Sequence, residues 1–517
     1  MRLNVLDRLI GAVSPERGLR RAAARARFDR VSAYAAGRQT LRTKQWQAPA
    51  TGPNAELAPA LALLRQRSRQ MVRDNPYAAR AVAILAAHQV GYGIVARWDD
   101  PAAQALWDRW IKACDLAGMQ SFEGLQWQVA RTRAESGEAL VRLIRVSPAQ
   151  MAARRLPVPL QIEVLEGDFL PEDTIAIRDS RFADRRVTCG VEFDHFGRRS
   201  FYWLRRRHPG EQAAWLALDE GLDRVPADSV LHIFRALRPG QVRGVPDATP
   251  VLLRLKELDD YEDAALARAK TEAMLGVFFT GPDPMDGGGE GSGTQKDPFT
   301  LDLFPGMATQ LPAGLEPKFL QPGSAGPFEP LALHHLHAAA AGFGVTYDQL
   351  TGDLRQANYS SLRAGKIEFR RMIEQDQWLL FIPRLCDPVA DAFAEAAMDA
   401  GVLPYRPDGY AREWGPPRFE MVDPIKEIGA AIASVRAGFS TWQDEVGGFG
   451  YDPRQQIKRI AEWNAELDDA GVILDTDPRR TANSGGAQNA AQNAAVEIAA
   501  TGAAMPRRED PQQETPP

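Results

Sequence analysis

Two groups of side chains in the middle of the chain have types and spacings that could hold metal ions. The first is a dense run of carboxylates, namely Glu257, Asp259, Asp260, Glu262 and Asp263. A nuclease can use paired carboxylates to hold its metal ions. On one helix, however, carboxylates three or four residues apart repel one another, and Arg254, Lys256, Arg268 and Lys270 are interleaved with them. The pattern therefore favours a charged helix face in water or along a lumen.

The second group is a set of three histidines, His334, His335 and His337. His334 and His337 are three residues apart and share a helix face, so that these two could bind one metal ion. No acidic or thiol partner lies nearby in the sequence. Polar helix packing or the lining of a channel is the favoured interpretation.

Other motifs of catalysis are absent from the sequence. The run from Gly287 to Gly293 has the composition of a phosphate loop but lacks the order G-x-x-x-x-G-K-[ST]. HExxH, GxSxG and CxxC signatures do not occur. We therefore expect no catalytic residue, no cofactor and no resident metal ion.

The totals describe an ordinary globular chain. It has 517 residues, of which 44% are apolar and 25% charged, and a net charge of −5. That charge argues against a general nucleic-acid binder. It is compatible with a protein that surrounds DNA without binding it tightly. Cys114, Cys189 and Cys386 are far apart and odd in number, which predicts three reduced thiols. No apolar run reaches the roughly 18 residues of a membrane helix.

The elements around the two groups predict a rod. A charged helix (residues 249–275) leads into a Gly- and Pro-rich excursion, and a second helix (330–343) returns from it. A polar loop (346–360) and a third helix (361–380) follow. A rod with a small protrusion at one end and a loop at the other is useful mainly when several copies stand side by side.

The rest of the chain predicts an α+β fold. Helical patterns fill residues 54–134, with Asn54 as a helix cap, and strand patterns follow at 139–146, 160–165, 187–193, 200–204 and 229–234. Beyond Pro383 we predict helices at 389–400, 425–437, 441–446 and 453–470. Residues 476–517 hold too few large apolar side chains to order themselves.

Several short segments, in this order and spacing, resemble one known family. They are Val31-Ser32-Ala33-Tyr34, Ala36-Gly37-Arg38, Asn75-Pro76-Tyr77-Ala78-Ala79-Arg80-Ala81, Arg133-Ala134-Glu135-Ser136-Gly137-Glu138, Leu165-Glu166-Gly167-Asp168, His232-Ile233-Phe234-Arg235, Arg238-Pro239-Gly240-Gln241-Val242-Arg243-Gly244-Val245-Pro246, Asn358-Tyr359-Ser360-Ser361-Leu362-Arg363 and Glu368-Phe369-Arg370-Arg371. Together they closely resemble the lambda family of phage portal proteins, over roughly residues 30–475.

The resemblance implies the portal fold, with an α/β wing, a two-helix stem, a small clip that contains β-strands, and a helical C-terminal crown. Mapped onto this sequence, the parts are a basic N-terminal arm (1–53), the wing (54–249), the first stem helix (250–275), the clip with its Gly-rich loop (276–329), the second stem helix (330–345), a tunnel loop (346–360), a long wing helix with its return to the wing (361–424), the crown (425–475) and a disordered tail (476–517).

The resemblance also implies a function without catalysis. Such proteins form a homo-oligomeric ring, usually of twelve subunits, at the portal vertex of the virion, after assembly in the host cytoplasm. Double-stranded DNA passes through the ring non-specifically during packaging and ejection. The implied partners are the terminase large subunit, a head–tail connector, and the major capsid or scaffold protein, with no membrane involved.

The resemblance gives the expected DNA-facing residues as well. The candidates for the channel are Glu257, Asp260, Arg355, Gln356, Asn358, Tyr359 and Ser360, and those for the stem lining are His334, His335 and His337. A ring of carboxylates would repel phosphate and keep DNA mobile, and Arg355 would add weak contacts.

Two other functions stay open at this point. One is a metal-dependent enzyme on nucleic acid, which would use the Asp/Glu cluster near Tyr261 and the histidines near His335. The other is a monomeric scaffold that binds protein partners only. The size of the purified protein and an assay for Mg²⁺-dependent DNA cleavage separate the three.

Overall fold

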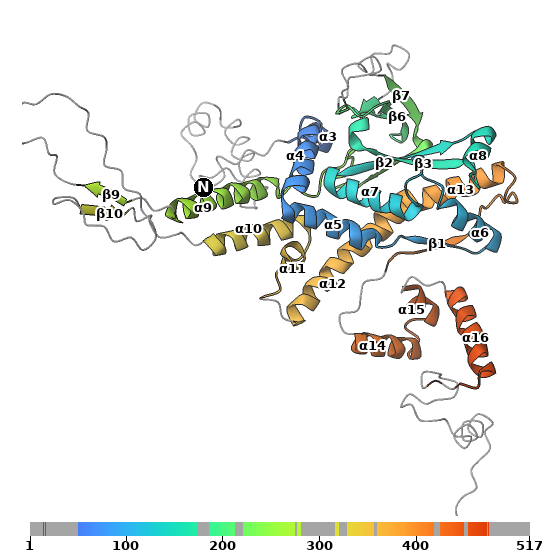
Figure 1. Ribbon diagram of the computed structural model, residues 1–517. Helices are drawn as coiled ribbons and strands as arrows, with labels where there is room; N and C mark the ends of the chain where they lie inside the picture. Colours follow the sequence, from blue (N-terminus) through green and yellow to red (C-terminus); the bar gives the residue numbers. More distant parts are fainter. Residues whose placement is uncertain are drawn as a thin grey trace, which may run out of the picture.

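The structure is a computed structural model, and it describes residues 50–172, 186–211, 221–273, 277–280, 316–319, 328–355, 359–417, 424–448 and 453–472, with the single residues 14, 16 and 474. Nearly all of the predicted basic arm, the Gly-rich loop of the excursion and the predicted tail lie outside these residues, as do the channel candidates Gln356 and Asn358. The chain is a mixed α and β protein, as predicted, and the body of the fold contains both sheets and helices (Figure 1).

A helical layer opens the body. It consists of α3 (Pro53–Leu57), α4 (Leu61–Asp74), α5 (Pro76–Val90), α6 (Pro101–Trp110) and α7 (Phe122–Ser136). Asn75 caps α5 through its side-chain oxygen, and Gly137 ends α7 in a left-handed conformation, as its sequence position predicts. The prediction that Asn54 caps the first helix is wrong. Its side chain instead bonds the backbone of Gly240 and Val242, far along the chain.

Two antiparallel sheets follow. The first has the order β3-β2-β8, from β3 (Leu160–Glu166), β2 (Glu138–Arg145) and β8 (Val230–Phe234). The second is a meander of β4 (Arg186–Thr188), β5 (Val191–Phe193), β6 (Arg199–Arg205) and β7 (Leu222–Pro226). Residues 187–193, predicted as one strand, are divided into β4 and β5 because Cys189 and Gly190 both have positive φ and make a turn.

Strand β2 separates two hydrophobic cores. Successive side chains of a strand point to opposite faces, so Ala139 and Val141 pack with the helices whereas Leu140 packs with the meander. The helical core is rich in aromatic rings, with Trp107 in contact with Trp98, Trp110, Phe122 and Phe393. A small sheet of β1 (Val95–Trp98) and β11 (Arg412–Gly415) borders it. This arrangement gives the body a rigid frame.

One helix is much longer than predicted. Helix α12 (Tyr359–Asp376) continues into a π-helical segment η5 (Gln377–Cys386) and then into α13 (Asp387–Asp399). We predicted a break at Pro383, but the helix does not end there. Proline lacks an N–H donor and crowds the preceding turn of an α-helix, and the wider π turns accommodate it. The result is one continuous helix over residues 359–399.

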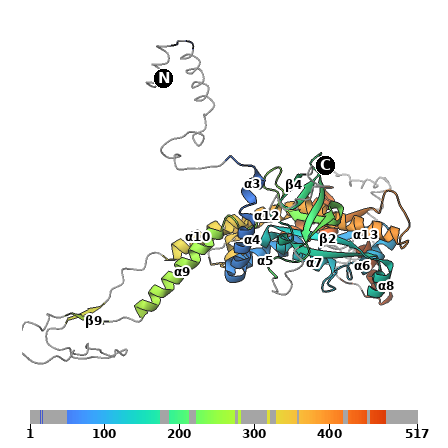
Figure 2. The same cartoon turned by 90° about the horizontal axis from the view of Figure 1, so that it is seen from above.

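A pair of helices projects from the body. Helix α9 (Leu252–Ala273) and helix α10 (Phe328–Phe343) run side by side, and both views show them pointing away from the body (Figures 1 and 2). Beyond them, β9 (Val277–Thr280) and β10 (Glu316–Phe319) pair antiparallel. We call α9 and α10 the projecting pair. A third core, which includes Leu255, Phe343, Leu350 and Phe369, holds its base to the body.

The C-terminal helices are α14 (Pro424–Arg436), α15 (Trp442–Gly448) and α16 (Pro453–Asp469). All three were predicted. Among the described residues from 424 to 472, Leu467 is the one buried side chain. Across the described part of the chain, no helix is long and apolar enough to cross a bilayer.

Candidate functional site

Glu138, the first residue of β2, lies at the centre of a buried ionic cluster. Its carboxylate accepts bonds from Arg243 Nε at 2.9 and 3.0 Å, from Arg243 Nη2 at 2.6 Å and from the Gly244 N–H at 2.8 Å. His232 Nε2 lies 2.9 Å and Arg65 Nη1 3.4 Å from it. We call Glu138, Arg243, His232 and Arg65 the Glu138 centre; all four are buried.

The Arg243 guanidinium also fixes the chain around the first sheet. It donates to the carbonyl of Gly167, which follows β3, at 2.6 Å, and to that of Cys189, between β4 and β5, at 3.1 Å. One planar donor therefore joins strands β2, β3 and β4.

Burial and Arg243 together set the protonation states of Glu138 and His232. Burial alone would raise the pKa of Glu138, but Arg243 and His232 outweigh it and hold that pKa below its usual range. Burial lowers the pKa of His232 to about 4, against the opposing effect of Glu138. His232 is therefore neutral near pH 7, and it donates a hydrogen bond to Glu138 from Nε2 rather than forming an ion pair.

Glycines make the close approach around Glu138 possible. A Cβ on Gly244 would overlap the Gly137 carbonyl, a Cβ on Gly137 would overlap the Val245 backbone, and a Cβ on Gly167 would overlap the Glu138 carboxylate. Gly137 has a φ of +90° in addition. These contacts explain why the segments that resemble the family carry glycine beside their charged residues.

A second polar network joins the helices to the first sheet. Asp376, the last residue of α12, pairs with Arg235 after β8 and accepts a bond from Gln89 of α5 at 2.7 Å. Arg133 of α7 pairs with Asp247 at 3.0 Å. Each of these side chains contacts a charged or polar neighbour within the protein, so the network fixes the helices against the first sheet.

The sequence reasoning missed both networks. Glu138, Arg243, His232, Arg133 and Arg235 stood in the segments that resemble the family, but their charges were not connected to one another. The available signal was His232 inside the apolar strand pattern at 229–234, and Glu138 directly before the pattern at 139–146, because a polar or charged group in a buried strand requires a partner.

The channel candidates on α9 lie exposed on the projecting pair. Glu257 and Asp260 are exposed, and Asp260 pairs with Lys256 one turn earlier. Asp259, in contrast, turns toward the body and accepts a bond from Asn75 Nδ2 at 2.8 Å. The carboxylates are thus divided between two faces of α9, which does not favour a shared metal ion.

The three histidines of α10 do not form a ligand set either. His337 stacks on Tyr347 with ring centroids 4.4 Å apart, whereas His334 and His335 meet edge to face at 6.2 Å. His334 and His337 are exposed. Their geometry agrees with the preference for polar packing.

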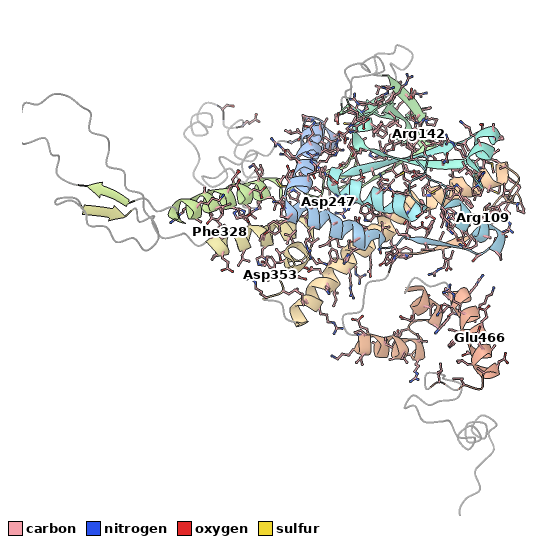
Figure 3. All side chains as sticks on the ribbon, in the orientation of Figure 1. Arg109, Arg142, Asp247, Phe328, Asp353 and Glu466 are labelled. Atoms are coloured by element: carbon pink, nitrogen blue, oxygen red, sulfur yellow. The ribbon has the colours of Figure 1, made fainter. Side chains whose placement is uncertain are left out.

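The predicted tunnel loop contains a short helix, α11 (Tyr347–Thr351), with a capping box from Thr346 and Gln349. Arg355 follows it and bonds Asp353 at 2.8 Å, and this hydrogen bond lowers the pKa of Asp353 to about 2. Figure 3 shows Asp353 below the projecting pair. Tyr359 and Ser360 begin α12, but their side chains lie outside the described part.

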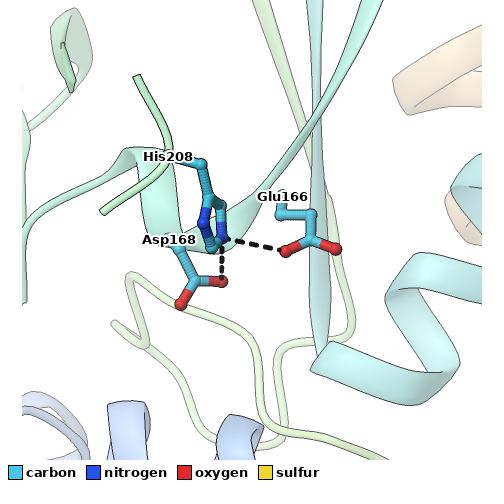
Figure 4. Close-up of side chains that lie close together, drawn as sticks. All are labelled: Glu166, Asp168 and His208. Carbon is cyan, nitrogen blue, oxygen red and sulfur yellow. Dashed lines mark ion pairs between the residues drawn. The ribbon is translucent and has the colours of Figure 1, made fainter. Parts of the chain in front are cut away.

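A group of three possible metal ligands lies elsewhere, on the body. Within the described part of the chain, Glu166, Asp168 and His208 are the group whose ligand atoms all lie within 4.8 Å of one another (Figure 4). Arg69 already pairs with both carboxylates, with Nη2 at 2.7 Å from Glu166 Oε2. Because a guanidinium occupies these oxygens, we interpret the group as an ion-pair cluster that ties α4 to the end of β3.

A cleft of about 1100 Å³ lies between the body and the C-terminal helices. Its body wall carries Asp99, Asp108, Glu374 and Glu413, and its other wall carries Arg454, Lys458 and Arg459. Arg97 Nη2 donates to the Gly447 carbonyl across it at 3.3 Å. Arg97 also stands on the body wall, and Asp444 and Glu462 on the other, so both walls carry mixed charges, with carboxylates in excess on the body wall.

The chain is similar to portal proteins of phages. The family described as "Phage portal protein, lambda family" matches residues 39–377. Among curated relatives, the "Probable portal protein" of Halomonas phage phiHAP-1 is 28% identical over 425 residues, which cover 77% of this chain and 79% of the relative. The "Portal protein B" of Escherichia phage lambda is 22% identical, with 82% of this chain and 88% of the relative covered.

Solved structures with a similar chain come from gene transfer agent particles. One, titled "Neck of native GTA particle computed with C12 symmetry", has a TM-score of 0.41 and 16% identity, covering 78% of this chain and 96% of that one. Another, titled "Neck of empty GTA particle computed with C6 symmetry", has a TM-score of 0.43 and 16% identity, covering 80% and 98%.

Proposed function

Because the chain belongs to the lambda family of phage portal proteins, we propose that copies of it stand side by side in a closed ring at the portal vertex of a capsid. Double-stranded DNA passes through the centre of this ring during packaging and ejection. The ring is a conduit and a docking platform, and the protein performs no catalysis of its own.

The projecting pair is the observation that carries this proposal. Helix α9 has 22 residues and spans about 33 Å. It is buried only near its start, at Leu252, Leu255 and Leu258, and most of its described later side chains, up to residue 270, are exposed. A projecting rod of this kind gains lateral support when identical rods stand beside it.

The bore of such a ring is electrostatically suited to DNA. Glu257 and Asp260 are exposed on α9, and every copy contributes both carboxylates at the same height. The rings of negative charge repel phosphate and limit tight binding, so the duplex slides. Arg355, Gln356, Asn358, Tyr359 and Ser360 follow α11 and form the part of the bore that meets DNA, with His334, His335 and His337 higher on the stem.

We assign the binding of partner proteins to the other parts of the chain. Residues 54–249 and the continuous helix form the wing, residues 276–329 the clip and residues 425–475 the crown. The clip meets the terminase large subunit during packaging and later the head–tail connector, and the wing meets the major capsid or scaffold protein. Twelve copies are proposed, assembled in the host cytoplasm and retained in the virion.

Negative-stain electron microscopy of the purified protein tests the proposal. We expect rings with a central hole, and their rotational symmetry gives the number of copies. A protein that stays monomeric at high concentration and beside its capsid protein contradicts the proposal. Mg²⁺-dependent cleavage of DNA by such a monomer would favour an enzyme instead.

A further inference from the structure

Two of the C-terminal helices carry apolar stripes that the described part of the chain leaves uncovered. On α14, Ile425, Ile428 and Ile432 are 86%, 48% and 48% exposed. On α16, Ile457, Ile460 and Trp463 are 51%, 42% and 56% exposed. Residues at spacings of three and four share one face of a helix, so each set forms a continuous stripe.

The α16 stripe points away from the body. Arg454, Lys458 and Glu462 recur every four residues and line the cleft toward the body. At 100° per residue, Ile457, Ile460 and Trp463 lie on the other side of the helix. The body of the same chain therefore faces the charged side of α16 and leaves Ile457, Ile460 and Trp463 exposed, whereas Leu467, one turn later on the apolar side, is buried.

The charge order of α16 indicates that this helix depends on contacts with its surroundings. Arg454, Lys458 and Arg459 stand in its first half, and Glu462, Glu466, Asp468 and Asp469 in its second. This order is opposite to the one that stabilises an isolated helix, because the helix dipole is positive at the N-terminus. Helices of 13 and 17 residues are in any case only marginally stable alone in water.

The choice of partner follows from what the chain offers. Beyond residue 475 the sequence has only three large aliphatic side chains, Val496, Ile498 and Met505, too few to cover either stripe. A second copy, in contrast, offers two different stripes on every subunit, which a head-to-tail contact needs to close into a ring.

We propose that the α16 stripe of one copy packs on the α14 stripe of the next copy, so that the C-terminal helices complete their core only between subunits. This contact rests on the proposed ring and names the residues that seal it at one end. The mixed charges of α16 then face the body of their own subunit on one side, while the apolar side faces the neighbouring subunit.

Cysteine cross-linking tests the contact in the full-length protein. In the double variant Ile432→Cys/Ile460→Cys, mild oxidation of assembled rings should convert the monomer band on a non-reducing gel into a ladder of linked multimers. The matched control is Ala430→Cys/Ala465→Cys, whose positions are exposed on the opposite faces of the same helices. The three native cysteines are buried, so the wild type should show no ladder.

Each outcome is informative. Rings without a ladder, or with cross-links confined to single chains, overturn this contact and leave the ring itself intact. A wild-type protein that never assembles overturns both. As a second measurement, Ile460→Asp should remove the hydrogen-exchange protection of residues 424–469 in assembled rings, whereas Ala465→Asp should preserve it. Equal protection in both variants also overturns the contact.

Discussion

Among single residues, the Glu138 centre concentrates the electrostatic stability of the body. A carboxylate without solvent contact is tolerated only when donors surround it. Here Arg243, the neutral His232 and the Gly244 N–H supply them from segments about 100 residues away in the sequence. When one partner is lost, the remaining charge stays buried without a compensating donor or acceptor. A single substitution here should therefore lower the stability of the fold strongly.

Replacement of Arg243 by methionine should lower the free energy of unfolding by about 3–5 kcal/mol, because Glu138 then stays buried without its main partner. Urea denaturation of the purified protein measures this. The control is Arg145→Met, whose pairs with Glu395 and Asp399 are solvent-exposed and should matter by about 0–1 kcal/mol. Equal losses in the two variants would show that the buried pair has no special role.

His232 should make the fold sensitive to acid. In the folded protein its pKa is about 4, below the ordinary 6.5, so the unfolded chain takes up a proton that the folded chain refuses. The free energy of unfolding therefore falls as the pH drops from about 6.5 to about 4, by up to about 3 kcal/mol.

The variant His232→Gln should abolish that slope between pH 6.5 and 4.5 when stability is followed by urea denaturation across pH. Below pH 4.5 a slope from Glu138 should persist, because its depressed pKa makes the folded state lose stability as the carboxylate is protonated. His195→Gln is the control, since His195 is exposed at the tip of the β5–β6 hairpin. An unchanged slope in His232→Gln would refute the assignment.

At the scale of helices and strands, short sequence patterns predicted most of the elements, but the sequence did not show which distant residues contact one another. The bounds of β2 followed to within one residue from the strand pattern at 139–146, because alternation acts within a few residues. The continuity of the helix through Pro383 did not follow, since the core contacts of Phe381 and Phe393 override the local effect of proline. Asn54 likewise bonds a loop almost 190 residues away, which no local pattern encodes.

The projecting pair depends on a ring contact between its two helices. Tyr261 of α9 and Phe328 of α10 stack with centroids 5.4 Å apart (Figure 3 labels Phe328). Phe328→Ala should remove about 0.5–1.5 kcal/mol of local stability and speed hydrogen exchange in the first turns of α10. Leu331→Ala is the control, because it has a comparable exposure but no ring contact among the described residues. Equal exchange in both variants would contradict the role of the stack.

For the whole molecule, the family and the fold class could be predicted from sequence, because their signals are the order and spacing of many short segments. The positions that would meet DNA in the proposed ring could not be predicted, since they depend on how the copies would pack around a common axis. Glu257 and Asp260 are exposed in one chain, which fits a bore but also fits any solvated helix. Their role therefore needs a test in the assembled state.

The double variant Glu257→Lys/Asp260→Lys should turn a repelling bore into one that retains DNA. We expect assembled rings of this variant to bind duplex DNA more tightly in a gel-shift assay, with an affinity that falls steeply as salt rises. The control is Asp399→Lys, a charge reversal at the exposed end of α13 on the body. Identical retention by the two variants would place Glu257 and Asp260 outside the bore.

The continuous helix over residues 359–399 connects the predicted tunnel loop directly to the core of the body. Its first turn follows the loop that we propose meets DNA, and its last turns hold Phe393 and Ala396 in the aromatic core. Since the helix does not stop at Pro383, we expect a displacement of its first turn to be passed on to its last turns. Spin-label distances between Arg363 and Asp399, which both lie on this helix, should therefore stay constant with and without DNA in the proposed ring.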